Sequence, residues 1–581
     1  MKRIIATLVI LATAAVSAAA AIVSPVVTPA KGEKAFTIHL MGDSTMAPKD
    51  LSKGNPERGW GMMFPNFLDG KVEVMNYAQN GRSTKSFIDL GLWDKVRENL
   101  KAGDYVFIEF GHNDAKEDDP QRYAPAFGAY LENLRTFVRT AQAAGAHPVL
   151  LTPVSRRWFK GGKLDLNCHT DYPAAMRQVA EETGAPLLDI LKLTQDWISG
   201  LGDEASAEFF MHIAPGTCPA CPDGKEDNTH TKANGARKVA SLVCQAISGC
   251  EALGELAGHL ATPADIVVAQ DGTGDYFTVQ EAINACPDYE HAHITTIHIK
   301  AGTYKEMVTI PHNKFRLHIK GDGAENTIIT YDKYATRHWP GTDRVMGTSG
   351  SASVYVHSSY VTFEDLTIEN TAGEGKEIAQ AVALFTDGDF LFFHNCRLIA
   401  NQDTVYTYGR YGKEGGIKRN YYLDCYIEGT TDFIFGPSIA YFEGCTIHSK
   451  KNSYVTAAST FEGQKYGYVF HNCRLTADEG IDKCYLGRPW GAYAKTVFIE
   501  CELGSHILPE GWHNWEKEGK PNTEKNSYYA EYRNYGPGAA DRKQRVKWSY
   551  QLTPKQAAEY TFEKVMYQPQ DGIVWNPFDN K

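Results

Sequence analysis

The sequence predicts two domains of different fold class: an α/β domain built on a parallel sheet, followed by a parallel β-helix. Three observations support this. The chain has 581 residues, which is more than one ordinary hydrophobic core accommodates. Residues 34–250 alternate strand-like and helical segments. From about residue 265 the helical periodicity mostly disappears, and one short strand-like pattern recurs at irregular intervals.

The composition is that of a soluble globular protein, with 43% hydrophobic and 22% charged residues. The net charge of -11 gives no indication of nucleic-acid binding, so no nucleic-acid partner is expected. That total says little about an acidic carbohydrate, because a local basic groove can exist within an acidic chain.

The first residues indicate export. Lys2 and Arg3 precede an apolar run from Ile4 to Val23 that ends in small residues, which predicts a signal peptide over residues 1–24. The alternative is an uncleaved membrane anchor. No other stretch approaches the roughly 20 apolar residues needed to cross a bilayer. We therefore expect a periplasmic or extracellular protein without a membrane association once the signal is removed.

Twelve cysteines are too few for a disulfide scaffold, but five of them gather early in the chain. The sequence Cys218-Pro-Ala-Cys221 has the C-x-x-C form, and Cys168 is followed by His169. Because a zinc site needs four ligands at suitable spacing, we favour disulfides in an exported protein, with zinc as the alternative. The disulfide connectivity cannot be read from the sequence. These early cysteines are Cys168, Cys218, Cys221, Cys244 and Cys250.

In the first half, the alternation of strand-like and helical segments predicts a parallel sheet covered by helices on both faces. Helices are expected over Tyr123 to Ala144 and over Pro173 to Thr183. In such sheets the functional sites lie at the carboxyl ends of the strands. The strands are expected at Phe36 to Met41, Val72 to Ala78, Tyr105 to Phe110 and Val149 to Val154.

Four short motifs fall at these element ends. Ser44 follows the first strand, Asn80-Gly81 the second and Gly111-His112-Asn113-Asp114 the third; Asp227 to His230 precedes a helical run over Ala233 to Val243. Taken singly, each motif is an ordinary turn or helix cap. Together and in this order they resemble the SGNH (GDSL-like) hydrolases, over most of residues 36–245. The segments Gly59-Trp60-Gly61 and Pro222 to Asp227 narrow the resemblance to rhamnogalacturonan acetylesterases.

That resemblance implies a three-layer α/β fold and an ester-cleaving Ser-His-Asp triad. Ser44 corresponds to the nucleophile and His230 to the general base, which Asp227 orients. The oxyanion donors would be the backbone N–H groups of Ser44 and Gly81 together with the Asn113 side chain. His112 is expected to be structural or to line the substrate site. The alternative is an inactive copy of the fold.

Residues 251–265 are expected to close the last helix of the first domain and to form a linker through Ala261-Thr262-Pro263. The predicted domains are therefore residues 34–255 and 262–581.

In the second half, six strand-like segments align at one small or apolar position. The separations of 30, 29, 20, 28 and 28 residues predict stacked coils joined by loops of variable length. A flat antiparallel sandwich is the alternative, but it does not explain one repeated pattern. Most cysteines at this register are expected to be unpaired thiols inside the coil. The aligned positions are Leu366, Cys396, Cys425, Cys445, Cys473 and Cys501.

Two aspartates share one offset in this repeat. Asp403 and Asp432 each follow a cysteine by seven residues, so they should lie on neighbouring coils with backbones about 5 Å apart. Two carboxylates that close titrate together, and a cation is needed to keep one ionised. Arg488, in the segment Leu486 to Trp490, is the candidate. Without further information, such a set is equally well a structural ion network.

Five segments, in order, resemble the signature segments of pectin methylesterases, whose fold is a right-handed parallel β-helix. They span nearly the whole second half, which agrees with the repeat. The segments are Gly302 to Glu306, Gln380 to Leu384, Gln402 to Thr404, Asp432 to Gly436 and Leu486 to Trp490.

This second resemblance implies that Asp432 is the nucleophile, kept ionised by Arg488. Asp403 would protonate the departing methanol and then act as base for the hydrolytic water. Gln380 and Gln402 would donate hydrogen bonds to the oxyanion. Neither half requires a metal or an organic cofactor. The segment Tyr411 to Arg419 is longer than the family pattern and could alter the groove. The aromatic residues expected to bind the sugar chain are Tyr406, Phe435, Trp490 and Trp512.

The sequence therefore predicts an exported, bifunctional, pectin-de-esterifying enzyme. Its second domain would release methanol from galacturonan methyl esters, and its first would release acetate from rhamnogalacturonan or related pectin. The first domain could instead act on another acetylated saccharide. The β-helix could instead be a polysaccharide lyase or hydrolase, which would shorten the polymer, or a non-catalytic pectin-binding module.

Overall fold

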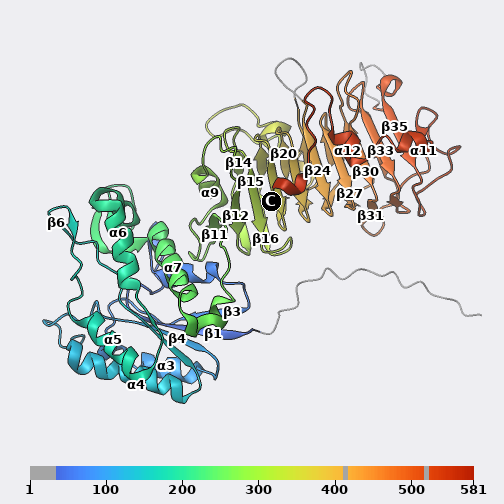
Figure 1. Ribbon diagram of the computed structural model, residues 1–581. Helices are drawn as coiled ribbons and strands as arrows, with labels where there is room; N and C mark the ends of the chain where they lie inside the picture. Colours follow the sequence, from blue (N-terminus) through green and yellow to red (C-terminus); the bar gives the residue numbers. More distant parts are fainter. Residues whose placement is uncertain (1–33, 410–416, 516–522, 581) are drawn as a thin grey trace, which may run out of the picture.

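The computed structural model describes residues 34–409, 417–515 and 523–580 (Figure 1). The predicted signal peptide and most of the long segment Tyr411 to Arg419 lie outside the described residues.

The first part of the chain forms a five-stranded parallel sheet in the order β3-β1-β4-β5-β8. Because its strands alternate side chains between two faces, Leu40 and Phe107 enter one core while Met41 and Ile108 enter the other. This confirms the predicted parallel sheet. The strands are β1 (Phe36–Gly42), β3 (Val72–Asn76), β4 (Tyr105–Glu109), β5 (His147–Leu151) and β8 (Leu187–Leu188).

Helices cover both faces of this sheet, as the alternating pattern predicts. Buried side chains of α1, α6 and α7 share one core, and those of α2, α3, α4 and α5 share the other. The predicted helix from Tyr123 is shorter than expected, because Gly128 leaves helical geometry and α4 begins only at Leu131. The helices are α1 (Trp60–Met63), α2 (Thr84–Asp89), α3 (Leu92–Asn99), α4 (Leu131–Ala143), α5 (Tyr172–Thr183), α6 (Ile190–Ser206), α7 (Ala233–Ser248) and α8 (Gly254–Ala257).

A small antiparallel sheet, β2-β10-β9, was not predicted and carries two of the expected site residues. Its central strand β10 (Lys225–Lys232) contains both Asp227 and His230. It pairs with β2 (Glu57–Arg58) and β9 (Phe210–Ile213), with a register shift between Asp227 and Thr231. The strand thereby fixes the His-Asp segment close to the start of α7. A two-stranded hairpin, β6 (Phe159–Lys160) and β7 (Lys163–Leu164), lies separately.

The second part is a parallel β-helix, which confirms the predicted fold class (Figure 1). Three parallel sheets of 11, 8 and 7 strands run along the coils. Each coil from β12 to β32 contributes one strand to each sheet in turn, and the coils at the two ends are incomplete. The 11-stranded sheet contains β11 (Ile266–Val268), β12 (Thr295–Ile299), β15 (Leu317–Gly321), β18 (Val361–Glu364), β21 (Leu391–His394), β24 (Arg419–Leu423), β27 (Ile439–Glu443), β30 (Tyr468–His471), β33 (Lys495–Ile499), β35 (Tyr528–Tyr532) and β36 (Tyr550–Gln551).

The other two sheets complete the coils. The 8-stranded sheet contains β13 (Gly302–Lys305), β16 (Thr327–Tyr331), β19 (Thr367–Asn370), β22 (Arg397–Ile399), β25 (Tyr426–Gly429), β28 (Thr446–Ser449), β31 (Arg474–Ala477) and β34 (Glu502–Leu503). The 7-stranded sheet contains β14 (Val308–Ile310), β17 (Val354–Val356), β20 (Leu384–Thr386), β23 (Val405–Thr407), β26 (Ile434–Gly436), β29 (Tyr454–Ala458) and β32 (Tyr485–Gly487).

Each recurring sequence segment turns out to hold two strands separated by a bend. The residue before the aligned position takes a positive φ, for example 48° at Asn395 and 52° at Asp424, which turns the chain from one sheet into the next. Asparagine, aspartate and glycine tolerate this conformation best. The same conformation recurs on successive coils, at Asp365, Asn395, Asp424, Gly444, Asn472 and Glu500.

The aligned positions stack inside the coil as the repeat predicts. Arg397 pairs with Tyr426 and Tyr426 with Thr446, so the preceding residues Cys396, Cys425 and Cys445 occupy equivalent places on successive coils. All of the aligned side chains are at most 1% exposed. The core of the β-helix is therefore built from a single repeated register.

All twelve cysteines are free thiols, so the expected disulfides among the early cysteines are a wrong prediction. The sulfur atoms of that group have different surroundings. The sulfur of Cys218 lies 3.7 Å from the carbonyl oxygen of Gly54, and that of Cys168 lies 3.7 Å from the Ser155 hydroxyl. Cys244 is a residue of α7 and packs into the core beneath that helix. The thiols predicted to be unpaired inside the coil are unpaired.

Two short helices and the chain end return along the 11-stranded sheet and cover part of its outer face (Figure 1). These are α11 (Pro554–Ala557) and α12 (Phe562–Met566). Two further short helices, α9 (Val279–Ala285) and α10 (Gly375–Ile378), lie along the coils. Within the described residues no single helix has the length and hydropathy for a membrane span; one bent pair, Ala233–Ser248 with Glu251–Ala257, meets both criteria jointly.

The two parts contact each other through side chains of the α/β part. Arg58 donates to the carbonyl oxygen of Gly272 at 3.1 Å and stacks over Phe277, while Arg237 pairs with Asp275. The last helix before the coil ends at Ala257, and the first coil strand begins at Ile266.

Candidate active sites

The residues expected to form the triad of the α/β part lie in hydrogen-bonding contact. The Ser44 hydroxyl lies 2.8 Å from Nε2 of His230, and Nδ1 of His230 lies 2.7 Å from Oδ2 of Asp227. The other carboxylate oxygen of Asp227 accepts the backbone N–H groups of Thr229 and His230. Burial raises the pKa of Asp227, but the His230 contacts and these N–H groups lower it more, so the carboxylate stays ionised.

The expected oxyanion donors border the same cavity, which has a volume of about 360 Å³. Gly81 follows β3 with a φ of 74°, a conformation that favours glycine. The Asn113 side chain donates one of its N–H bonds to the carbonyl oxygen of Arg82 at 2.9 Å, which leaves its second N–H available. His112 contacts Asp43 at 3.1 Å and also borders this cavity.

Lys49 holds residues of this site in place, although the sequence gave no reason to select it. Its ammonium group contacts the carbonyl oxygen of Ser44 at 2.5 Å, Oδ1 of Asn80 at 2.7 Å and the Glu57 carboxylate at 2.8 Å. The side chain is almost fully buried. One cation therefore fixes both the backbone of the serine and the loop that carries Gly81.

Two further cations border the cavity and were also missed from the sequence. Arg156 and Lys116 line it beside Ser44, and both are half-buried. Arg156 donates to the Thr229 hydroxyl and to the carbonyl oxygen of His112. No motif marks these two residues, because they come from loops that only the fold brings together.

The two aspartates of the β-helix occupy equivalent positions on adjacent coils. Val405 on β23 pairs with Ile434 on β26, which places Asp403 beside Asp432 two residues earlier. The backbone N–H of Asp403 donates to the carbonyl oxygen of Thr431 at 3.1 Å, continuing the ladder. Both side chains open into a cavity of about 600 Å³. The equal offset from the cysteines therefore predicted their proximity.

Arg488, which follows β32, binds Asp432 through two parallel hydrogen bonds. Its Nε donates to Oδ1 at 2.9 Å and its Nη2 to Oδ2 at 2.6 Å. The guanidinium is itself stacked against the rings of Tyr454 and Trp515, at 3.9 and 4.0 Å from their centroids. This two-point contact matches an ionised carboxylate and orients it.

The surroundings separate the protonation states of the two carboxyl groups. Burial, followed by the negative charge of Asp432, raises the pKa of Asp403 well above its usual range. Burial also raises the pKa of Asp432, but the Arg488 hydrogen bonds and charge oppose that rise. Asp432 therefore loses its proton first, and there is a pH range in which Asp403 is neutral beside an ionised Asp432.

Two amides and several aromatic rings complete this cavity. Gln380 and Gln402 both line it. Tyr406 and Phe435 stack at 4.1 Å between centroids, and Trp490 lies 6.5 Å from Tyr406. The residues predicted as oxyanion donors, and three of the four predicted sugar-binding rings, therefore border one cavity.

The expectation for Trp512 is wrong. Its side chain is 0% exposed and packs between Phe498 and Tyr529 inside the coil, so it cannot contact a sugar chain. Trp515, three residues later, lines the cavity instead. The sequence showed two nearby tryptophans, but only the bend of the chain decides which of them points outward.

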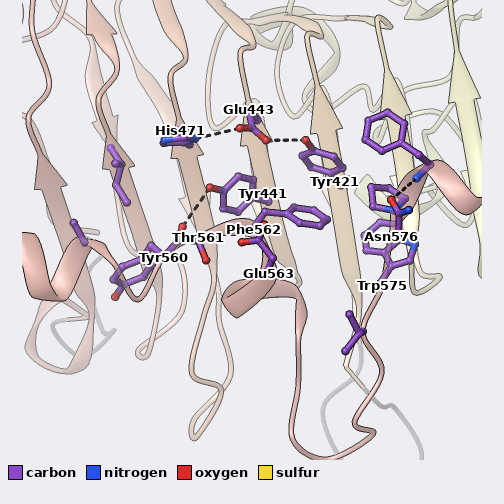
Figure 2. Close-up of a pocket in the computed structure, with 15 residues that line it drawn as sticks. Tyr421, Tyr441, Glu443, His471, Tyr560, Thr561, Phe562, Glu563, Trp575 and Asn576 are labelled. Carbon is purple, nitrogen blue, oxygen red and sulfur yellow. Dashed lines mark hydrogen bonds and ion pairs between the residues drawn. The ribbon is translucent and has the colours of Figure 1, made fainter.

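A second cavity of similar size, about 610 Å³, lies on the 11-stranded sheet and contains none of the expected catalytic residues. Figure 2 shows its polar wall, where Tyr421 and His471 both contact Glu443, at 2.7 and 3.3 Å. The opposite wall is the returning chain end, including Phe562 and Trp575.

The geometry thus defines two separate sites for attack on a carbonyl carbon. One has a hydroxyl in contact with a His-Asp pair, and the other has a carboxyl group held by an arginine beside a second carboxyl group. Comparison with known proteins gives the same class, because both matched families are families of ester hydrolases. Residues 265–569 match the family Pectinesterase, and residues 40–215 match the GDSL-like Lipase/Acylhydrolase family. The protein is a carboxylic ester hydrolase.

Its particular family follows from the longer match. The chain belongs to the pectinesterase family, whose model covers more than half of it. It is 36% identical over 316 residues to Pectinesterase 31 of Arabidopsis thaliana, covering 54% of this chain and 95% of that protein. It is 37% identical over 329 residues to Pectinesterase/pectinesterase inhibitor PPE8B of Prunus persica, covering 54% of this chain and 58% of the relative. The chain thus spans little more than half the length of that second relative.

Solved structures match the same half. A pectin methylesterase from carrot is 33% identical, with 53% of this chain and 94% of the other covered and a TM-score of 0.47. Pectin methylesterase PemA from Erwinia chrysanthemi is 31% identical, with 55% and 99% covered and a TM-score of 0.46.

Proposed function

We propose that the protein is an exported enzyme that removes two kinds of ester from pectin: methyl esters at the Asp403–Asp432 site and acetyl esters at the Ser44 site. The observation that carries the first activity is the two-point Arg488–Asp432 pair beside a carboxyl group whose pKa is raised. The second activity rests on the Ser44–His230–Asp227 hydrogen-bond chain.

At the methyl-ester site, a carboxylate oxygen of Asp432 attacks the ester carbonyl carbon and forms a tetrahedral intermediate. Gln380 and Gln402 donate N–H groups to its oxyanion, a role suited to neutral amides. Asp403 is neutral when Asp432 is ionised, so it can protonate the departing methoxide and release methanol. Asp403 then removes a proton from water, which attacks the acyl-enzyme anhydride. Collapse releases the uronic acid, which gives its proton to solvent and leaves as the uronate, and regenerates ionised Asp432 with protonated Asp403.

At the acetyl-ester site, His230 removes the Ser44 proton while Ser44 attacks the acetyl carbonyl. The backbone N–H groups of Ser44 and Gly81 and the Asn113 amide stabilise the oxyanion. The protonated imidazole gives its proton to the departing sugar hydroxyl, and water then cleaves the acetyl-serine by the reverse sequence of proton transfers.

The charges around the Ser44 cavity favour an acidic acetylated sugar. Arg156 and Lys116 border the cavity, and Nε of Arg156 is buried without a hydrogen-bond partner. A uronate carboxylate near these two cations would gain charge-assisted hydrogen bonds, which a neutral sugar cannot supply. We therefore prefer acetylated galacturonate-containing chains over neutral acetylated polysaccharides.

The test uses the full chain and its Asp432→Asn and Ser44→Ala variants on methylated, acetylated pectin, with methanol, acetate and polymer length measured together. Asp432→Asn should lose methanol release and keep acetate release, and Ser44→Ala should do the reverse. Unchanged methanol release by Asp432→Asn would overturn the first assignment, and unchanged acetate release by Ser44→Ala the second. Shortening of the polymer by the wild type would indicate a lyase or a glycoside hydrolase instead.

A further inference from the structure

We propose that His312, His357 and Asp387 form a binding site for a divalent metal ion of the zinc type, separate from both ester sites. Among the described residues they are a group of potential ligands whose ligand atoms all lie within 4.8 Å of one another. Nδ1 of His357 lies 3.8 Å from Oδ2 of Asp387, and the rings of His312 and His357 are 5.5 Å apart.

The β-helix itself produces this convergence. The three residues follow β14, β17 and β20, which are neighbouring strands of the 7-stranded sheet. Backbone ladder bonds continue past the strand ends, from the N–H of His357 to Ile310 and from the N–H of Asp387 to Val356. His357 therefore lies on the middle coil, with His312 on the coil before it and Asp387 on the coil after it. Neighbouring coils are only about 4.8 Å apart, so the three side chains are within reach of one ion.

The side chains are available as ligands. No hydrogen bond to the side chain of His312, His357 or Asp387 occurs within the described parts of the chain; the contact between His357 and Asp387 at 3.8 Å is too long for one. His357 and Asp387 are partly exposed and His312 is exposed, so an ion can reach all three from solvent. Buried or paired histidines elsewhere in the coil, such as His318 with Glu364, do not have this freedom.

The donor set suits zinc. Imidazole nitrogen and carboxylate oxygen bind Zn²⁺ at about 2.0–2.2 Å, so ligand atoms around a tetrahedral ion lie roughly 3.3 Å apart. The observed separations of up to 4.8 Å require side-chain shifts of about 1.5 Å at most, which small rotations of these exposed and partly exposed side chains can supply. Magnesium and calcium prefer sets made of oxygen atoms only, so they fit less well. Three protein ligands leave a fourth position open to water or to a carboxylate oxygen.

An ion bound at this location would have two effects on the protein. It would connect three successive coils and so stabilise this end of the β-helix. It would also border a row of outward-facing rings, because Tyr355 stacks on His357 and Phe385 contacts both His357 and Tyr406. Tyr406 lines the Asp403–Asp432 cavity, so the metal site lies at the far end of the same aromatic surface.

The test is zinc binding to the chelator-treated full chain, measured by titration calorimetry and by the rise in unfolding temperature. Wild type should bind one zinc ion more than His357→Gln or Asp387→Asn, or bind it at least about tenfold more tightly, since even outer-shell partners contribute that much. Its unfolding temperature should rise with zinc, and those of the two variants should rise less.

His298→Gln is the matched control. His298 lies on β12 of the same β-helix and pairs with Asp322 at 2.6 Å. This pair is not part of any three-ligand group within the described residues. This variant should bind zinc as the wild type does. Equal zinc binding by the wild type, His357→Gln and Asp387→Asn would overturn the site, as would an equal rise in unfolding temperature. Circular dichroism without zinc should be unchanged in each variant, because none of these side chains is buried.

Discussion

At the scale of single residues, one guanidinium decides which carboxyl group of the methyl-ester site is ionised. Asp403 and Asp432 have equivalent positions on neighbouring coils, but only Asp432 receives the two hydrogen bonds of Arg488. The division of roles between two otherwise similar aspartates is therefore electrostatic.

Replacing Arg488 by glutamine should move the acidic limb of methanol release to higher pH. Arg488 lowers the pKa of Asp432 against the effect of burial, so its removal raises that pKa. Because the proposed reaction needs ionised Asp432, activity should fall about tenfold for each pH unit below the new limb. The pH dependence of kcat/KM for methanol release checks this, and acetate release should not change. An unshifted acidic limb would show that Arg488 does not control this ionisation.

Replacing Asp227 by asparagine tests the triad of the other site. The asparagine can no longer stabilise a protonated His230 or hold its tautomer, so kcat for acetate release should fall by up to about 10⁴-fold. Methanol release serves as the internal control for folding and concentration. A loss smaller than tenfold would mean that another group orients His230.

At the scale of structural elements, a bend with positive φ separates consecutive sheets of the β-helix. Asn472 is the cleanest example, since it is exposed and its φ is 52°. Its backbone N–H continues the ladder by donating to Ile499. The residue type there matters because of backbone geometry rather than packing.

Asn472→Val should destabilise the protein by about 1–2 kcal/mol, because a β-branched residue is strained in this conformation. Asn472→Gly is the matched comparison and should stay within about 0.5 kcal/mol of the wild type, since glycine adopts positive φ freely. Urea unfolding of the three proteins measures the difference. Equal stability of the valine and glycine variants would contradict a φ requirement at this bend.

At the scale of the whole molecule, the two sites use different parts of the chain and share no residue. The Ser44 cavity is built from the α/β part, and the Asp403–Asp432 cavity from coils of the β-helix. The contacts between the parts include those of Arg58, Asn66 and Arg237, none of which lines those two cavities. Independent loss of the two activities is therefore expected.

The absence of disulfides gives a further prediction for the whole chain. All twelve cysteines are free, so alkylation of the unfolded, unreduced protein should add twelve groups. A reducing agent should leave the unfolding temperature unchanged, because no cross-link restrains the unfolded chain. Mass spectrometry after alkylation measures the count. Fewer than twelve labelled thiols would show that some cysteines pair in solution.

The sequence by itself determined the fold class of both parts and the proximity of Asp403 and Asp432. Both results follow from periodicity: strands alternating with helices specify a covered parallel sheet, and a repeated register places equal offsets on adjacent coils. The motifs likewise located Ser44, Gly81, Asn113, Asp227 and His230, because each falls at the end of an element or beside one.

Only the tertiary structure decided the features that depend on direction rather than spacing. The bend inside each repeat buries Trp512 and turns Trp515 toward the cavity. The loops bring Lys49, Arg156 and Lys116 to Ser44, although no local pattern marks them. The early cysteines were close enough in sequence to suggest pairing, but their sulfur atoms have different surroundings. Spacing along a chain fixes which coil or strand end a residue occupies, whereas backbone turns and packing fix where its side chain points.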